Sequence, residues 1–255
     1  MRRLATAAVL MPLVIYVVFF GPVVLFQVVV AAMAFICFQE FASIAQAQGI
    51  PLPAMLGQAL GLVFLFLPRL EWLAIVGLFL VLSTVALRSP KLADALPMAA
   101  AALLGILYIY GGWRCALVLR EASPWWLMLP VSINWVGDSA AFFIGKNFGK
   151  NKLAPRVSPG KTWEGAIASA VTTTVYGAAL LQLAGVALPV WQAVALSFVT
   201  GVAGQIGDLV ESAMKRGAGV KDSGNTLPGH GGWLDRLDST LFSMPVVALY
   251  LRLAL

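Results

Sequence analysis

The chain has 255 residues, of which 60% are hydrophobic and only 11% are charged, and its formal net charge is +6. This balance excludes a soluble globular domain, because a soluble exterior carries more charge and a soluble core needs less apolar surface. Apolar runs of roughly 20 residues, long enough to cross a bilayer as helices, recur along the whole chain. Helices are the expected form, since lipid offers no hydrogen-bond partner to an open strand edge.

The apolar runs predict an all-α, polytopic integral membrane protein with about nine transmembrane helices. In chain order they cover 4–20, 23–45, 54–68, 72–87, 98–119, 125–145, 164–185, 189–214 and 237–255. The first run follows two arginines in the manner of a signal peptide. It leads through Gly21 and Pro22 directly into the second run, without a small-residue cleavage site, which favours a retained helix.

The basic residues predict the orientation. With a cytoplasmic N-terminus and nine spans, thirteen of the seventeen lysines and arginines fall on the inner side. The positive-inside rule then places the loops 146–163 and 215–236 in the cytoplasm. The same bias, or attraction to anionic headgroups, explains these residues without any functional site, so the basic residues alone do not identify one.

Acidic residues near the ends of the last two runs need a different explanation. A charge at the centre of a bilayer costs roughly 2.5–3.5 kcal/mol even on lenient insertion scales. Asp208 and Glu211 are three residues apart near the end of one run, and Asp235 and Asp238 repeat that spacing at the start of the next. Residues three apart share a helix face. We therefore expect the four carboxylates to meet at one membrane face.

Each of these acids also has a structural alternative. Glu211 precedes Lys215 by four residues, which suits an internal ion pair. One of Asp235 and Asp238 suits the N-terminus of a helix. If the carboxylates converge, they need a cation between them, and hard oxygen ligands without thiolates favour Mg²⁺ or a similar ion over zinc.

Three further residues stand out against the apolar background. His230, the only histidine, lies in the polar segment KDSGNTLPGHGGWLDRLDS, from Lys221 to Ser239. It is interpreted as a hydrogen-bonding or substrate-binding group. Asp138 is another acid within an apolar run, near a cytoplasmic end. Glu40 stands alone in the second run and is interpreted as structural.

The segment RVSPGKTWEG, from Arg156 to Gly165, ends like a phosphate-binding P-loop. Pro155 stands where that motif needs glycine, and no buried strand precedes it, so the P-loop interpretation is rejected. Ser158, Lys161 and Thr162 lie just before a helix start, where free N–H groups and the helix dipole favour anions. An ordinary capping role for Thr162 remains an equal alternative.

Acids suited to a metal, basic groups and glycine-rich loops at a membrane surface are typical of phosphoryl or nucleotidyl transfer. An ion-coupled transporter or channel is the alternative from another class, because it also buries acids in its spans. It has no evident need for a long glycine-rich loop of mixed charge.

The segment SAMKRGAGVKDSGNTLPGHGGWLDRLD, from Ser212 to Asp238, closely resembles the signature of the phosphatidate cytidylyltransferase family, also called CDP-diacylglycerol synthases. SPGKTWEG and GDSAAFFIGKNFGK are similar to the family's other motif blocks, in the expected order. The resemblance is sharp over 132–240 and general before it, and Trp233 departs from the family's usual aliphatic residue, methionine or phenylalanine. The compact acidic pattern of CDP-alcohol phosphotransferases, a second enzyme class with a metal-dependent membrane site, is absent.

The resemblance implies a metal-dependent nucleotidyltransferase that joins CTP to phosphatidic acid, forming CDP-diacylglycerol and releasing pyrophosphate. The implied metal ligands are Asp208 and Asp235, with Asp238 and Glu211 in support, and the cofactor is Mg²⁺ or a similar divalent cation. The catalytic group implied by the motifs comprises Asp208, Asp235, Asp238, Lys161, Lys221 and Arg236. The substrate-binding group comprises Ser158, Thr162, Lys215, Arg216, His230 and Asp138.

The expected partners are CTP, phosphatidic acid and membrane lipids, without nucleic acid, and a homodimer is implied by the resemblance alone. The chain is expected to form a single membrane domain, with N-terminal helices over 1–120 and catalytic helices and cytoplasmic loops over 125–255. The expected location is the cell inner (plasma) membrane, with the active-site loops facing the cytoplasm.

Overall fold

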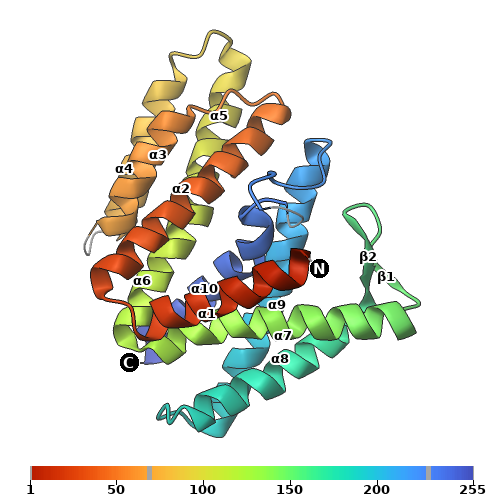
Figure 1. Cartoon of the computed structure of the whole chain (residues 1–255). Coiled ribbons are helices and arrows are strands. Elements are labelled where there is room, and N and C mark those ends of the chain that lie inside the picture. The colour runs from red at the N-terminus through yellow and green to blue at the C-terminus, as the bar shows by residue number, and fades with distance from the viewer. Residues whose placement is uncertain (1, 68–70, 228–230, 255) are drawn as a thin grey trace. The chain divides into compact units, whose positions relative to one another are not determined.

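The computed structural model describes residues 2–67, 71–227 and 231–254. These residues are almost entirely helical, which confirms the predicted all-α class (Figure 1). The elements in chain order are α1 (Arg2–Phe19), α2 (Val23–Ala47), α3 (Ala54–Phe66), α4 (Glu71–Ala86), α5 (Leu92–Gly105), the π-helical η1 (Ile106–Gly111), α6 (Gly112–Ala122), α7 (Pro124–Phe148), β1 (Lys152–Ala154), β2 (Ser158–Thr162), α8 (Trp163–Leu183), α9 (Val190–Gly217) and α10 (Leu234–Ala254).

Six helices in the described ranges are long and apolar enough to cross a membrane: α2, the continuous Leu92–Ala122, α7, α8, α9 and α10. The expected count of about nine spans is therefore not confirmed, although the membrane class is. The difference includes α3 and the apolar stretch Leu73–Ala86, which are shorter. The 13 residues of α3 reach about 20 Å at 1.5 Å per residue, less than the ~30 Å hydrocarbon core.

The chain divides into two compact units, each with its own packing. The first unit comprises Met1–Val9, Pro22–Arg114 and Met214–Arg236. The second unit comprises Leu10–Gly21, Cys115–Ala213 and Leu237–Leu255. The predicted motif segments therefore belong to different units. The loop after α9 belongs to the first unit, and the hairpin before α8 belongs to the second.

In the first unit, α2, α3 and α5 lie side by side (Figure 1), and η1 packs against all three. The rings of Phe38 and Tyr110 lie 5.6 Å apart and are fully buried. Gly61 faces Tyr110 so closely that a Cβ there would lie 2.2 Å from the ring. The Tyr110 hydroxyl donates a hydrogen bond to Gln58, which satisfies two polar groups inside an apolar bundle.

In the second unit, α7 and α8 lie side by side (Figure 1). Small residues allow this approach: a Cβ on Gly137 would lie 2.7 Å from the Ser169 hydroxyl, and one on Gly165 would lie 2.8 Å from the Ala141 carbonyl. Without a hydrophobic driving force between helices in lipid, such close backbone packing is the usual source of association. The sequence of α7 and α8 is thus suited to a tight pair.

The antiparallel hairpin β1–β2 joins the ends of α7 and α8 (Figure 1). The sequence predicted only a loop here, because two strands this short carry little periodic signal. The hairpin is closed at its base, where the Trp163 N–H donates to the Asn151 carbonyl at 2.9 Å and the Asn151 amide donates to Glu164 at 2.8 Å. Thr162 caps α8 by accepting from the Gly165 N–H at 3.2 Å, so its capping alternative is confirmed.

Candidate active site

The second unit joins the hairpin to α9 by an ion pair. The Lys161 ammonium lies 2.6 Å from an Asp208 carboxylate oxygen, and each side chain is about a quarter to a third exposed (27% and 31%). Asp208 also accepts from the Ser212 hydroxyl at 3.2 Å, one helical turn along α9. Two residues that the sequence assigned to one site are therefore in direct contact.

Other acids of the second unit lie near Asp208. Asp238, on α10, is 7% exposed, and Glu211, on α9, is fully buried. Asp238 interacts electrostatically with Asp208, Glu211 and Asp138. A group of like charges in a poorly hydrated setting is costly unless a cation or hydrogen-bond donors compensate it. The meeting of all four carboxylates at one membrane face stays a prediction.

Metal binding stays a prediction. Within 2–67, 71–227 and 231–254, no group of three His, Cys, Asp or Glu side chains is placed to hold a metal ion. The donor chemistry nevertheless fits a hard cation, because Asp208, Glu211 and Asp238 offer only carboxylate oxygens. Asp235, the other predicted ligand, belongs to the first unit.

The first unit holds a second lysine–aspartate pair. The Lys215 ammonium lies 2.5 Å from the Asp235 carboxylate, and their side chains are 11% and 5% exposed. The same carboxylate accepts from the N–H groups of Ser223 and Gly232, at 2.9 and 2.8 Å. Helical spacing had paired Lys215 with Glu211, and the contact with Asp235 needed a loop closure that local sequence does not encode.

Glu40, on α2, makes contacts with the polar loop that the sequence did not predict. It is 6% exposed, and both carboxylate oxygens accept hydrogen bonds from the polar loop. The donors are the hydroxyls of Ser223 and Thr226, at 2.9 and 2.8 Å, and the N–H groups of Trp233 and Leu234, at 3.1 and 2.8 Å. The sequence did show an acid within an apolar run at this position, but the hydrogen-bond donors of Glu40 lie more than 180 residues away along the chain.

These contacts also assign the cap of α10. The N–H groups of Trp233 and Leu234 are at the start of that helix, where donors lack an intrahelical partner. Glu40 accepts both. The sequence had offered Asp235 or Asp238 for the start of this helix, and Asp235 does lie in its first turn, where it accepts from the Gly232 N–H at 2.8 Å. A carboxylate from a distant helix adds the acceptor for the next two N–H groups.

The glycines of the polar loop follow from the same geometry. A Cβ on Gly232 would lie 2.3 Å from a Glu40 oxygen, and one on Gly224 would lie 2.8 Å from the other oxygen. Gly231 has φ +78°, a conformation that glycine adopts without strain, and a Cβ there would lie 2.5 Å from Asp235. The loop is glycine-rich because its backbone closes directly onto two carboxylates.

The remaining predicted residues have simpler surroundings. Lys221 and Arg236 are exposed in and after the polar loop, and Arg216 is exposed and donates to the Val220 carbonyl at 3.3 Å. Ser158 begins β2 and is half-buried. His230 lies outside the described residues.

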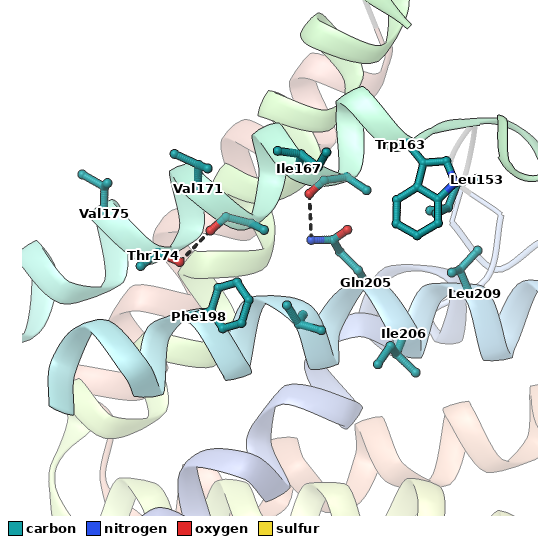
Figure 2. A pocket seen from close by; sticks show the side chains of 13 residues that line it. Leu153, Trp163, Ile167, Val171, Thr174, Val175, Phe198, Gln205, Ile206 and Leu209 are labelled. Atoms are coloured by element: carbon teal, nitrogen blue, oxygen red, sulfur yellow. Dashed lines mark hydrogen bonds between the residues drawn. The ribbon is translucent and has the colours of Figure 1, made fainter. Parts of the chain in front are cut away.

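An apolar groove runs along α8 and α9 in the second unit (Figure 2). Its volume is about 680 Å³, and its walls include Trp163, Ile167, Phe198 and Leu209. The polar side chains along it are satisfied by backbone: Gln205 donates to the Ala166 carbonyl at 3.3 Å, and Thr174 donates to the Ala170 carbonyl at 2.6 Å (Figure 2). The groove therefore offers an almost wholly apolar surface.

The fold and the site together define a polytopic helical membrane protein whose polar segments carry lysine–aspartate pairs. The chain matches the cytidylyltransferase family over residues 1–254. Phosphatidate cytidylyltransferase of Staphylococcus aureus (strain COL) is 32% identical over 228 residues, which are 86% of each chain. The enzyme of the same name from Bacillus subtilis (strain 168) is 50% identical over 121 residues, 48% of this chain and 44% of that protein. The chain therefore belongs to the cytidylyltransferase family.

Proposed function

We propose that this protein is a phosphatidate cytidylyltransferase, which transfers CMP from CTP to phosphatidic acid in phospholipid biosynthesis. In this reaction a phosphate oxygen of the lipid attacks the α-phosphorus of CTP. The bond between that phosphorus and the bridging oxygen of the β-phosphate breaks, pyrophosphate leaves, and CDP-diacylglycerol remains. The names of the relatives support this assignment, and the observation that carries it to individual residues is the presence of the two lysine–aspartate pairs in the family's motif segments.

The two lysines are assigned to the anionic substrates. An ammonium is a compact positive point charge suited to phosphate oxygens. It can stabilise the negative charge that develops on the phosphate oxygens during phosphoryl transfer. Asp208 and Asp235 hold Lys161 and Lys215 in place in the protein without substrate. Arg216, Lys221 and Arg236 are exposed in the motif segments and extend the same positive charge.

We also propose a divalent cation, with Mg²⁺ as the first candidate. Asp208, Glu211 and Asp238 would hold it, because Asp238 interacts electrostatically with the other two, as it does with Asp138, and Asp235 remains a candidate from the first unit. When bound, the ion would neutralise charge on the phosphates. Asp208 also binds Lys161, so part of its charge is already compensated.

The test is an assay of purified protein with labelled CTP, phosphatidic acid and Mg²⁺. The expected result is a lipid-soluble nucleotide with release of pyrophosphate, and its complete loss in excess EDTA with recovery on adding Mg²⁺. A protein that makes no such product, but moves ions across a sealed vesicle, would be a transporter. Full turnover after exhaustive chelation would contradict the metal site but not the proposed reaction.

The loops 146–163 and 215–236 are proposed to face the cytoplasm, in the inner (plasma) membrane. The excess of basic residues in these loops supports this orientation. CTP does not cross a sealed bilayer, so inside-out vesicles are expected to consume added CTP, and sealed right-side-out vesicles are not. The opposite result would reverse the orientation. A homodimer rests on the family resemblance only, and the mass of the detergent-solubilised protein tests it.

The groove on α8 and α9 is proposed to take one acyl chain of the lipid substrate. Its wall from Trp163 to Val175 spans about 18 Å at 1.5 Å per residue, close to the ~15 Å of one leaflet. One end is lined by Leu153, Trp163 and Leu209. That is the end at which Lys161 contacts Asp208, so a lipid phosphate beside Lys161 would leave its chain in the groove.

Filling this groove is expected to discriminate between substrates by chain length. Ala170→Phe should raise the KM for dipalmitoyl phosphatidate by about tenfold, the usual scale for losing apolar contacts in a pocket. The KM for dihexanoyl phosphatidate should stay unchanged, because a short chain does not reach the filled part. Ala140→Phe, in a second apolar hollow of the same unit, is the matched control. Equal effects on both lipids, or a change in oligomeric state, would contradict the proposal.

A further inference from the structure

We propose that Glu40 is a positioning residue for the reaction: its carboxylate holds Ser223, Thr226, Trp233 and Leu234 in the arrangement that presents Asp235 and Lys215 to the substrates. The proposal rests on the proposed function for the identity of those substrates. Its geometry rests on contacts within the first unit. No motif of the polar segments includes Glu40, since it lies in the second apolar run.

The number of donors on Glu40 separates it from an ordinary buried acid. A carboxylate that is 6% exposed in an apolar bundle is costly unless it is fully hydrogen-bonded. Here four donors from one loop converge on its two oxygens. The interaction is reciprocal, because the N–H groups of Trp233 and Leu234 are helix-terminal donors that need an acceptor. The Glu40 carboxylate and these two N–H groups therefore satisfy one another.

Ser223 connects Glu40 directly to the catalytic acid. Its hydroxyl donates to Glu40 at 2.9 Å, and its N–H donates to Asp235 at 2.9 Å. The Asp235 N–H in turn donates to the Ser223 hydroxyl at 3.3 Å. A shift of the Glu40 carboxylate therefore reaches Asp235 through one residue, and reaches Lys215 through its ion pair with Asp235.

A second contact attaches α2 to the last turn of α9, which leads into the same loop. The Gln48 amide, at the C-cap of α2, donates to the Met214 carbonyl at 2.8 Å. Helix α2 thus contacts the chain both before and after Lys221. Two exposed basic residues lie between these contacts, Arg216 in the last turn of α9 and Lys221 in the loop. This arrangement holds the loop over α2 before any substrate binds.

The test compares Glu40→Gln with the parent enzyme. Glutamine keeps the shape, but its amide nitrogen donates and faces donors that need an acceptor. The kcat/KM for CTP is expected to fall by about tenfold or more, the scale for leaving a buried donor unsatisfied. Amide hydrogen exchange in 223–234 should become faster in the protein without substrate. Glu40→Asp, which restores the charge at a shorter reach, should recover part of both properties.

Tyr110→Phe is the matched control for a purely structural role. It removes a buried hydrogen bond to Gln58 in the same unit but does not touch the loop. Its thermal stability should fall, while its kcat, its KM and the exchange rate of 223–234 stay at the parent values. If Glu40→Gln behaves in the same way, with normal kinetics for each folded molecule, Glu40 is structural and the proposal is wrong.

Thr226→Val keeps the proposal testable if Glu40→Gln does not fold. Thr226 is exposed and loses only one hydrogen bond to Glu40. Faster exchange in 223–234 and a roughly threefold lower kcat/KM are expected, the scale of one hydrogen bond. Unchanged values would overturn the proposal. If the parent protein has no cytidylyltransferase activity, the proposed function is wrong. The exchange measurement would still report whether Glu40 holds the loop.

Discussion

Replacing Asp235 with asparagine is expected to lower turnover on the order of a hundredfold or more, the scale for losing one strong electrostatic contact in a catalytic site. The carboxylate holds the nearly buried Lys215 ammonium at 2.5 Å and two backbone N–H groups. Asparagine keeps the shape but leaves that ammonium without its counter-charge. Breaking a buried pair in this way typically costs about 3–5 kcal/mol. The free energy of unfolding should therefore fall along with turnover, and steady-state kinetics with thermal unfolding measure both.

Two further variants separate the roles of Asp235. Asp222→Asn makes the same charge change at an exposed position of the same loop, and its turnover should remain close to that of the parent. The double variant Asp235→Asn with Lys215→Met removes both charges and should regain stability. If it also regains turnover, Asp235 serves only to neutralise Lys215, and its catalytic assignment is wrong. A stable but inactive double variant supports that assignment.

Asp208→Asn is expected to lower turnover to a similar extent, about a hundredfold or more, with little change in stability. The reason for the contrast is exposure. The Lys161 and Asp208 side chains are 27% and 31% exposed, and ion pairs open to solvent contribute a median of only about 0–1 kcal/mol. A loss of turnover in a protein with a normal unfolding temperature would therefore report on the reaction itself.

Lys161→Gln is the companion variant on the other side of this pair. It should raise the KM for CTP or phosphatidate more than it lowers kcat, because it removes a charge assigned to substrate binding. Asp208→Asn should act mainly on kcat and change the dependence on Mg²⁺ concentration. If both variants raise only KM, by the same factor, Asp208 acts through Lys161 and is not a metal ligand.

The helical class could be predicted from the sequence because it depends on composition alone. The family resemblance assigned Lys161 and Asp208 to one site, but it did not predict that they form an ion pair. The hairpin β1–β2 was not accessible. Its eight strand residues carry no usable alternation, and it is closed by the side-chain contacts of Asn151 with Glu164.

The contacts of Glu40 with the loop, and of Lys215 with Asp235, were not predicted for a different reason. Both depend on where the polar loop folds back, and spacing along one helix says nothing about that. The i, i+4 rule offered Glu211 as a partner for Lys215, and it gave no sign that the loop brings Asp235 to the same ammonium. An acid in an apolar run was visible at position 40, but its meaning came only from four donors that lie far along the chain.

The attachment of the polar loop to α2 means that the motif-bearing half of this chain is not a transferable module. A fragment beginning at residue 115 would keep α7 to α10, yet Trp233 and Leu234 would lose the acceptor for their helix-terminal N–H groups. A chimera joining this half to the first helices of another protein would need a carboxylate at the position of Glu40. It would also need glycines opposite, because any Cβ at 224 or 232 meets that carboxylate. Residues 40, 224 and 232 therefore constrain one another as a set, although more than 180 residues separate the first from the other two.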